Sequence, residues 1–504
     1  MSLFEIDYTS NAAHEKRLKE QQEQVMNALQ KLSIKVKLQT QKPSSVENKQ
    51  EEPENYSYKK SYTALGDKNI MYSPYYDNSI GKRIARPSLS SQWSVPLYQS
   101  NSSVATQRTS SVSTAALYEE NTEHSNDSDL SVTDCDLEQR DVYGFKKPTQ
   151  YVDIERIEEI EQQNELIMEK QRKRWQKLSA NTDVQWPAKC HQFLRWVKNG
   201  IPREMKPEVW INYSNTSCKI EQNPELYKSL LEKAIEMGKS NEYAIIIQRD
   251  LHRTFPDNPF FFCSEDPDIN SILASSQDNG SKIQKLHRVL LAFSVHSPEI
   301  GYCQSFNFLT GLLVILFEEE QAFWMLHTMV YDFFPRNMFD TQMEGANIEQ
   351  TVLTMLIYEK MPGVWAKIAN RKCFWECEKE DCLPPITLVT NHWFMTLFIN
   401  ILPIETVLHI WDCFFAGEGF KILYQVALTI IKLNEESIWN AEDSVEAFQI
   451  LQNMPKTLID SHDFMKTVFS PSGIAFDITM QDVNRRRDLF RDRKRERKNH
   501  QKRK

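Results

Sequence analysis

The spacing of apolar residues limits the fold of this chain more than any other feature of its sequence. From residue 186 to about residue 469, aromatic and aliphatic side chains recur every three or four positions, as they do along one face of an α-helix. Helices are predicted at 283–294, 320–330, 348–359, 393–401, 406–415 and 420–433. No alternating run bounded by turn residues indicates a β-sheet. About 280 residues of amphipathic helix therefore predict one large all-α domain with a substantial core.

The first 140 residues have the opposite character. They are rich in Ser, Asn, Gln, Glu and Lys and poor in apolar side chains, which make up 40% of the whole chain. Such a segment buries too little apolar surface to offset the entropy lost on ordering, so we expect residues 1–140 to be mostly disordered. Leu18, Val25 and Leu32 recur every seven residues and predict a short helix near 12–38. That helix is either transient and solvated or a weak coiled coil.

Order is expected to begin near Asp141. A glycine turn between two aromatic residues, Tyr143-Gly144-Phe145, is followed by a long amphipathic helix at 153–178 whose charges form a solvated face. We therefore interpret residues 141–199 as a helical extension that leads into the main domain at 200–470.

The remaining residues, 471–504, form a basic C-terminal tail. Between 485 and 504 there are twelve basic and three acidic side chains, a local charge of +9 in a chain whose net charge is −9. The tail is predicted to be a solvated charged helix or a disordered end. Alternatively, it is attracted to anionic lipid or serves as a nuclear import signal. The negative charge of the whole chain argues against a dedicated nucleic-acid-binding protein.

Absent signals argue against several other classes of protein. Residues 1–8 have neither the basic nor the apolar region of a signal peptide, and the longest apolar run, 306–317, is too short to cross a bilayer. Nine cysteines without a secretory start indicate a reducing compartment, so a cytoplasmic location is expected. Cys373, Cys377 and Cys382 contain no CxxC pair, which argues against a zinc site. Without a Walker loop, the chain is not expected to bind a nucleotide by itself.

The first segment that could carry chemistry surrounds Arg253. A helix is predicted at 245–255 and ends at Pro256, which places Arg253 and Thr254 in its last turn. Asp250 lies three residues before Arg253 and on the same helical face. Its carboxylate could fix the guanidinium and aim it outward, or the two residues could form an ordinary surface salt bridge.

The second segment surrounds Gln304. Pro298 and Gly301 break the preceding helix and an apolar run begins at Phe306, so Gln304 is expected at a helix N-terminus. Its amide could orient a water molecule, or it could simply cap the helix. The histidines are scattered, with neither an HExxH motif nor an obvious triad, so a hydrolase with its own nucleophile is not expected.

Taken together, these segments resemble the TBC domain of Rab GTPase-activating proteins. Ile247, Asp250, Arg253 and Thr254 match the arginine-finger motif IxxDxxRT at every specified position, and Tyr302 and Gln304 match the glutamine-finger motif YxQ. Flanking matches are Gly200-Ile201-Pro202, Val209-Trp210, Trp393-Phe394, Leu402-Pro403, Trp411-Asp412 and Glu418-Gly419. The resemblance covers roughly 280 residues of the chain. The segments 141–145 and 253–258 suggest a subgroup that includes the growth-hormone-regulated TBC protein and fungal activators of secretory Rabs.

Three positions depart from the family pattern. Lys206 stands where the family usually has Arg, and Ser305 replaces the usual Gly after the glutamine. Residues 373–385 form an unusual Cys-containing elaboration. None of the departures removes a finger residue, so we expect the elaboration to affect the choice of Rab more than catalysis.

The resemblance implies a mechanism. The substrate would be a Rab protein that carries GTP and Mg²⁺, so no cofactor is expected for this chain, and the reaction would be phosphoryl transfer to water. Arg253 would stabilise charge on the phosphates and Gln304 would position the water, both acting in trans on the Rab. Asp250 and Thr254 would support Arg253, and Tyr302 would position the glutamine segment. The chain would thus activate a GTPase without a nucleotide site of its own.

Two further hypotheses come from other classes of function. The chain could be a non-catalytic Rab effector or scaffold that acts through its N-terminal region. It could also be an adaptor for membranes or cell polarity, in which the basic tail and the N-terminal helix are the working parts. The presence of both Arg253 and Gln304 favours the activator, because a protein that only binds needs neither. The family implies a role in vesicle-mediated transport and exocytosis, in the cytoplasm and peripherally at membranes.

Overall fold

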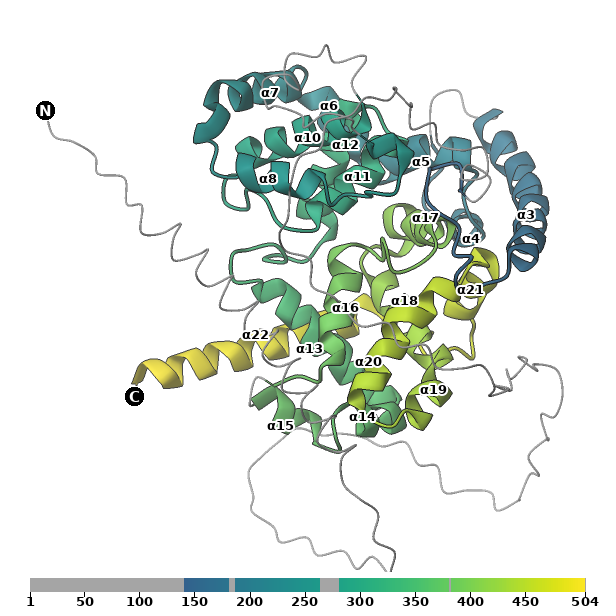
Figure 1. The fold of residues 1–504 in the computed structure, drawn as a ribbon, viewed down its shortest axis with the longest axis vertical. Helices are drawn as coiled ribbons and strands as arrows, with labels where there is room; N and C mark the ends of the chain where they lie inside the picture. Colours follow the sequence, from purple (N-terminus) through teal and green to yellow (C-terminus); the bar gives the residue numbers. More distant parts are fainter. Residues whose placement is uncertain (1–139, 181–185, 263–280, 380–381, 504) are drawn as a thin grey trace, which may run out of the picture. The chain divides into compact units, whose positions relative to one another are not determined.

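The computed structural model describes residues 140–180, 186–262, 281–379 and 382–503, and these residues are arranged as a helical unit without β-strands (Figure 1). One isolated bridge joins Arg140 and Lys146. The expected all-α class is confirmed. The region predicted to be disordered, with its short helix near 12–38, lies outside the described residues except for Arg140. No helix among the described residues is long and apolar enough to span a membrane.

The helices follow one another with short connections. The first half contains α3 (Ile154–Ala180), α4 (His191–Lys198), α5 (Lys206–Tyr213), α6 (Thr216–Gln222), α7 (Leu226–Met237), α8 (Ala244–Leu251), α10 (Lys282–His296), α11 (Phe306–Leu316) and α12 (Glu319–Thr328). The second half contains α13 (Glu344–Lys360), α14 (Pro362–Ile368), α15 (Phe374–Lys379), α16 (Ile386–Met395), α17 (Ile404–Cys413), α18 (Lys421–Leu433), α19 (Glu435–Asn440), α20 (Ser444–Asn453), α21 (Ser461–Val468) and α22 (Met480–Arg503).

The prediction of a helix at 393–401 is wrong. Helix α16 begins earlier, at Ile386, and ends at Met395, and the next residues form turns in which Leu397, Phe398 and Asn400 have positive φ. The Leu397 carbonyl accepts a hydrogen bond from Nε1 of buried Trp411 at 3.2 Å. The apolar residues after Met395 are therefore buried by a turn, and their spacing resembles that of a helix only by coincidence.

A buried carboxylate joins the start of the domain to α17. Asp412 Oδ2 accepts hydrogen bonds from Lys206 Nζ at 2.6 Å and from the Ile201 amide at 2.9 Å, while Oδ1 accepts one from Trp210 Nε1 at 2.9 Å. Burial raises the pKa of Asp412 to about 6, although Lys206 acts in the opposite direction. Lys206 therefore supplies the positive charge that this buried carboxylate requires.

The basic C-terminal segment forms α22, which packs along α13 (Figure 1). Arg487 Nε and Nη2 donate to the two oxygens of Glu349 at 2.8 and 2.7 Å, and both side chains are buried. Tyr424 Oη donates a third hydrogen bond to Glu349 at 2.6 Å. Phe490 is 3% exposed and lies against the ring of Phe374. This segment is therefore neither a solvated helix nor a disordered end, and those two predictions are wrong.

The elaboration at 373–385 contributes to the same packing. It contains α15, whose buried Glu378 forms ion pairs at 2.7 Å with both Arg493 and Arg497 of α22. Eight basic side chains of α22 lie within 4.0 Å of a carboxylate: Arg486, Arg487, Arg491, Arg493, Lys494, Arg495, Arg497 and Lys498. Much of the positive charge of the tail is therefore neutralised within the fold. Its attraction to anionic lipid stays a prediction.

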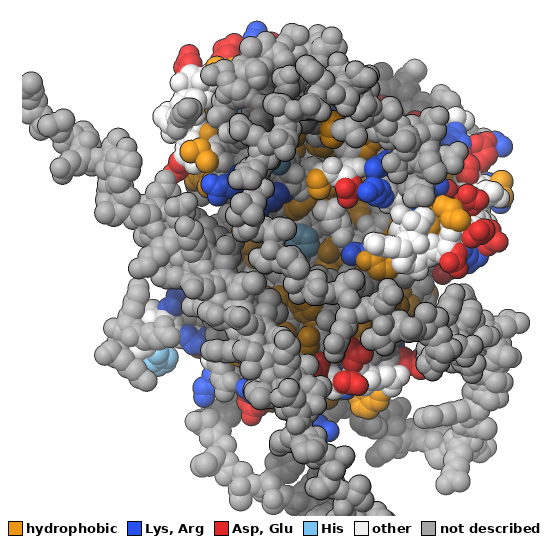
Figure 2. All heavy atoms as spheres, in the orientation of Figure 1, with side chains coloured by type: hydrophobic (Ala, Val, Ile, Leu, Met, Phe, Trp, Pro, Cys, Tyr) orange, Lys and Arg blue, Asp and Glu red, His pale blue; other side chains and the backbone are white. Residues whose placement is uncertain are grey.

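Helix α3 is amphipathic, as predicted for 153–178. Ile157, Ile160 and Trp175 are buried. Acidic and basic side chains are interspersed on its outer surface, on the right of Figure 2, and Arg172 pairs with Glu169 and with Glu204. The charges of α3 therefore form a solvated face, as expected.

Candidate functional site

Arg253 lies in a turn that follows α8. The helix ends at Leu251, so the prediction that it continues to Pro256 is wrong. The Arg253 and Thr254 amides donate to the carbonyls of Asp250 and Leu251, at 3.2 and 3.0 Å, and Phe255 then adopts a φ of +49°. A left-handed φ is incompatible with a continuing right-handed helix. The guanidinium therefore extends from a fixed turn, and the side chain of Arg253 is 59% exposed.

A buried carboxylate connects Arg253 to the glutamine segment. Arg253 Nη2 donates to Asp250 Oδ1, and Tyr302 Oη donates to Asp250 Oδ2 at 2.8 Å. The side chain of Asp250 is only 5% exposed. Burial and the charge of Asp250 both raise the pKa of Tyr302, which keeps its hydroxyl protonated and able to donate. This pair is therefore not an ordinary surface salt bridge, because its carboxylate is buried and shared.

A second set of hydrogen bonds joins the same two segments. Thr254 Oγ1 donates to the Asp250 carbonyl at 2.8 Å and accepts a hydrogen bond from Asn307 Nδ2 at 2.9 Å. Asn307 Oδ1 in turn accepts from the Ser305 amide at 3.3 Å. The sequence analysis gave Asn307 no role. The available signal was a polar residue in the first turn of an apolar helix, which the structure buries to 2% exposure.

Gln304 lies exposed in the turn just before α11. The N-cap of α11 is Ser305, which makes no side-chain cap, so Gln304 does not cap this helix. Within the described parts of the chain, no hydrogen-bond partner is found for its side-chain amide. Burial raises the pKa of the neighbouring Cys303 thiol to about 12, so this thiol stays protonated. The chemical group presented by this turn is therefore the amide.

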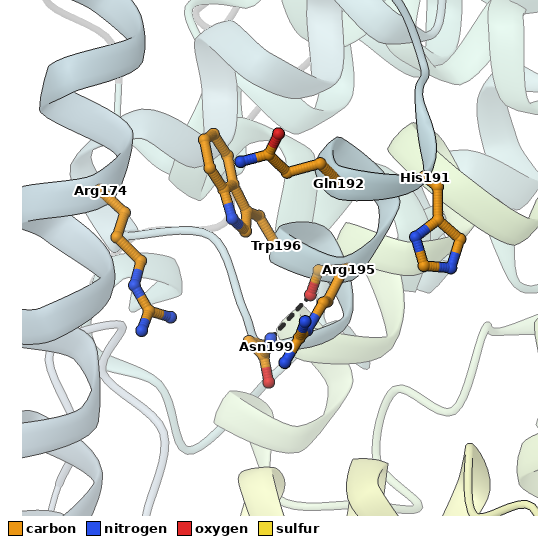
Figure 3. A pocket seen from close by; sticks show the side chains of 6 residues that line it. All are labelled: Arg174, His191, Gln192, Arg195, Trp196 and Asn199. Carbon is orange, nitrogen blue, oxygen red and sulfur yellow. Dashed lines mark hydrogen bonds between the residues drawn. The ribbon is translucent and has the colours of Figure 1, made fainter.

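Two concave regions lie near these elements. An open cleft of about 1240 Å³ has Arg253 on its wall, together with residues 140–151, part of α3 and the 399–405 turn. A smaller pocket of about 620 Å³ contains Arg174 of α3, which extends toward Arg195 and Asn199 (Figure 3). None of the residues predicted for the site lines the smaller pocket. Among the described residues there is also no cluster of His, Cys, Asp and Glu that could hold a metal ion.

Comparison with known proteins decides the family. The model of the Rab-GTPase-TBC domain matches residues 175–439. The chain belongs to this family. The predicted resemblance is therefore confirmed, and a Rab GTPase is the partner that the family implies. Residues 140–174 and helices α20 to α22 lie outside the matched range.

Relatives of this TBC domain are found in fungi, animals and algae. GTPase-activating protein GYP3 of Saccharomyces cerevisiae is 33% identical over 388 residues, which are 65% of this chain and 60% of that protein. Growth hormone-regulated TBC protein 1 of Homo sapiens is 32% identical over 355 residues, which are 70% of this chain and 94% of that protein. The crystal structure of the Chlamydomonas flagellar RabGAP TBC domain is 25% identical, with a TM-score of 0.51, and covers 66% of this chain and 99% of that one.

Ser305 is the one departure from the family pattern that involves backbone strain. Its φ is +125°, a region that favours glycine, which the family usually has here. We expect Ser305→Gly to stabilise the TBC domain by about 1 kcal/mol, because relief of strain exceeds the entropic cost of glycine. Urea unfolding followed by circular dichroism measures the effect. A lower unfolding midpoint in Ser305→Gly would contradict this account of the turn.

Proposed function

We propose that this protein is a GTPase-activating protein for a GTP-loaded Rab and supplies Arg253 and Gln304 to the reaction in trans. The observation that supports this most directly is the shared Asp250 carboxylate, which binds the arginine segment and the glutamine segment at once. A protein that only bound a Rab would need neither group. GTP and Mg²⁺ belong to the Rab, so the chain requires no cofactor of its own.

The arginine would act on the charge that develops during phosphoryl transfer. A guanidinium is planar, always charged and has five N–H donors. Asp250 engages Nη2 of Arg253, which leaves the other donors for phosphate oxygens. Asp250 also limits the conformations of the side chain before the Rab arrives, and a positioned donor loses less entropy in the transition state.

The glutamine would act on the attacking water. An amide can accept a hydrogen bond from the water through its oxygen and donate another through its nitrogen. Gln304 suits this role because it is exposed next to a turn that Asn307 and Tyr302 connect to the Arg253 turn. We place the activity in the cytoplasm and peripherally at membranes, in vesicle-mediated transport and exocytosis.

The test is phosphate release from a panel of purified Rabs loaded with GTP. Stimulation of one or a few Rabs by catalytic amounts of the full-length chain would establish the activity and name the substrate. If a folded, helical preparation stimulated no Rab but bound one, the protein would be an effector and not an activator.

Gln304→Ala is expected to lower the stimulated rate by about 10²-fold or more, because the water loses its positioned partner. The measurement is single-turnover phosphate release at saturating concentrations of the variant. Gln222→Ala provides a matched control, since Gln222 is also exposed but lies at the end of α6. Full activity of Gln304→Ala would mean that the Rab uses a glutamine of its own.

A further inference from the structure

The motif at 141–145 has no role in the mechanism above, and it lies outside the range matched by the family model. Asp141 folds it into a tight turn, in which Oδ1 accepts hydrogen bonds from the amides of Tyr143 and Phe145 at 2.8 and 3.0 Å. Gly144 has a φ of +83° and donates its amide to the Asp141 carbonyl at 3.1 Å. The bridge between Arg140 and Lys146 closes the turn. We refer to residues 140–146 as the N-terminal turn.

The N-terminal turn packs on the loop that follows Arg253. Asn258 Nδ2 donates to the Tyr143 carbonyl at 2.8 Å, and Arg140 Nη1 donates to the Asp257 carbonyl at 2.6 Å. The fit is close, because a Cβ on Gly144 would lie 2.4 Å from Asn258 Oδ1. The two segments are more than 100 residues apart in sequence, so this contact is tertiary.

The aromatic part of the contact falls on Phe255, two residues after Arg253. The rings of Phe145 and Phe255 meet edge to face with centroids 4.9 Å apart. On its other sides Phe255 contacts Phe261 and also Phe308 of α11, the helix that begins just after Gln304. Phe255 is only 5% exposed. Its ring is therefore held between the N-terminal turn and the helix of the glutamine segment.

The backbone of Phe255 needs such support. A bulky residue at a φ of +49° is unusual and persists only where its surroundings enforce that conformation. This residue ends the turn that carries Arg253, so a change in its backbone would reorient that turn. The groups that hold Phe255 therefore also determine where the guanidinium lies.

We propose that the N-terminal turn is a positioning element for Arg253, and that Phe145 acts through Phe255 to hold the arginine turn in its active conformation. The proposal rests on the function proposed above. Phe145 is a positioning residue and not a catalytic one, because it contacts the neighbour of the finger. The catalytic unit then extends upstream of the family-matched range by about 35 residues, from residue 175 to residue 140.

The test uses the full-length chain with Phe145→Ala, Phe145→Tyr and Val142→Ala. Phe145→Tyr keeps the ring, and Val142→Ala alters an exposed residue of the same turn, so both are matched controls. The first readout is hydrogen exchange at 253–258, where the Thr254 and Asn258 amides are hydrogen-bonded. The second readout is kcat and KM for the Rab, in the phosphate-release assay.

Phe145→Ala is expected to speed exchange in 253–258 and to lower kcat by about 10–10²-fold, with KM for the Rab unchanged within about twofold. Both controls should resemble the wild type in exchange and kcat. If Phe145→Ala does not fold, Arg140→Ala replaces it, because that change removes only the hydrogen bond to Asp257 and should lower kcat severalfold.

Three results would overturn the proposal: unchanged exchange in 253–258, altered exchange with an unchanged kcat, or a loss confined to KM. A wild-type chain that stimulates no Rab would instead refute the proposed function. In that case the exchange data would still show whether the N-terminal turn holds the loop, so the two failures can be told apart.

Discussion

Replacing Arg253 with alanine is expected to lower stimulated Rab GTP hydrolysis by at least about 10³-fold, while the domain stays folded. An arginine finger supplied in trans contributes about 10³–10⁵ in rate in GTPases. The side chain of Arg253 is 59% exposed, so its removal exposes no core and should leave the unfolding midpoint unchanged. Single-turnover phosphate release at saturating variant concentration measures the loss directly.

Two further variants make the result specific for the guanidinium. Arg253→Lys should be almost as impaired as Arg253→Ala, because an ammonium group lacks the planar set of donors. Arg249→Ala should behave as wild type, since Arg249 is exposed on α8 one turn before the finger. Near-wild-type activity of Arg253→Ala would show that Arg253 is not the finger.

The second large effect is on stability. Arg487→Ala would leave the Glu349 carboxylate buried with no guanidinium, and breaking a buried pair in this way costs about 3–5 kcal/mol. Urea unfolding of the full-length chain, followed by tryptophan fluorescence and circular dichroism, measures the change. Replacing both members, in Arg487→Met with Glu349→Met, should recover much of the loss because no buried charge remains.

Arg491→Ala is the matched control for Arg487→Ala. Arg491 lies one turn further along α22 and pairs only with Asp488 of the same helix, whose side chain is 71% exposed. Such a pair contributes about 0.5 kcal/mol or less. Equal losses in the two variants would mean that α22 is not held by its buried pair.

The helices that could be predicted from sequence are those with long, regular apolar spacing. Helix α10 was expected at 283–294 and spans Lys282–His296, and α18 was expected at 420–433 and spans Lys421–Leu433. The ends of α8 and α16 could not be predicted in this way. At both sites the chain leaves the helix at residues with positive φ, Phe255 and Leu397, which contacts from distant segments support.

The site shows the same division between local and distant information. The spacing of Asp250 and Arg253 within one helical turn, and the position of Gln304 before an apolar helix, were visible in the sequence. The bond between Tyr302 and Asp250 spans 52 residues, and the contact of Asn258 with Tyr143 spans 115. Local periodicity carries no information about such pairs, so the role of the N-terminal turn and of Asn307 emerged only from the structure.

The pairing of Glu349 with Arg487 has a consequence for biosynthesis. These residues are 138 positions apart, and a chain grows by about 5–20 residues per second, so Arg487 is made roughly 7–28 s after Glu349. During that interval the carboxylate has no guanidinium to accompany it into the interior, and burying it alone is costly. The surface of α13 that later receives α22 therefore stays open in the nascent chain. For that period its apolar residues are available to molecular chaperones.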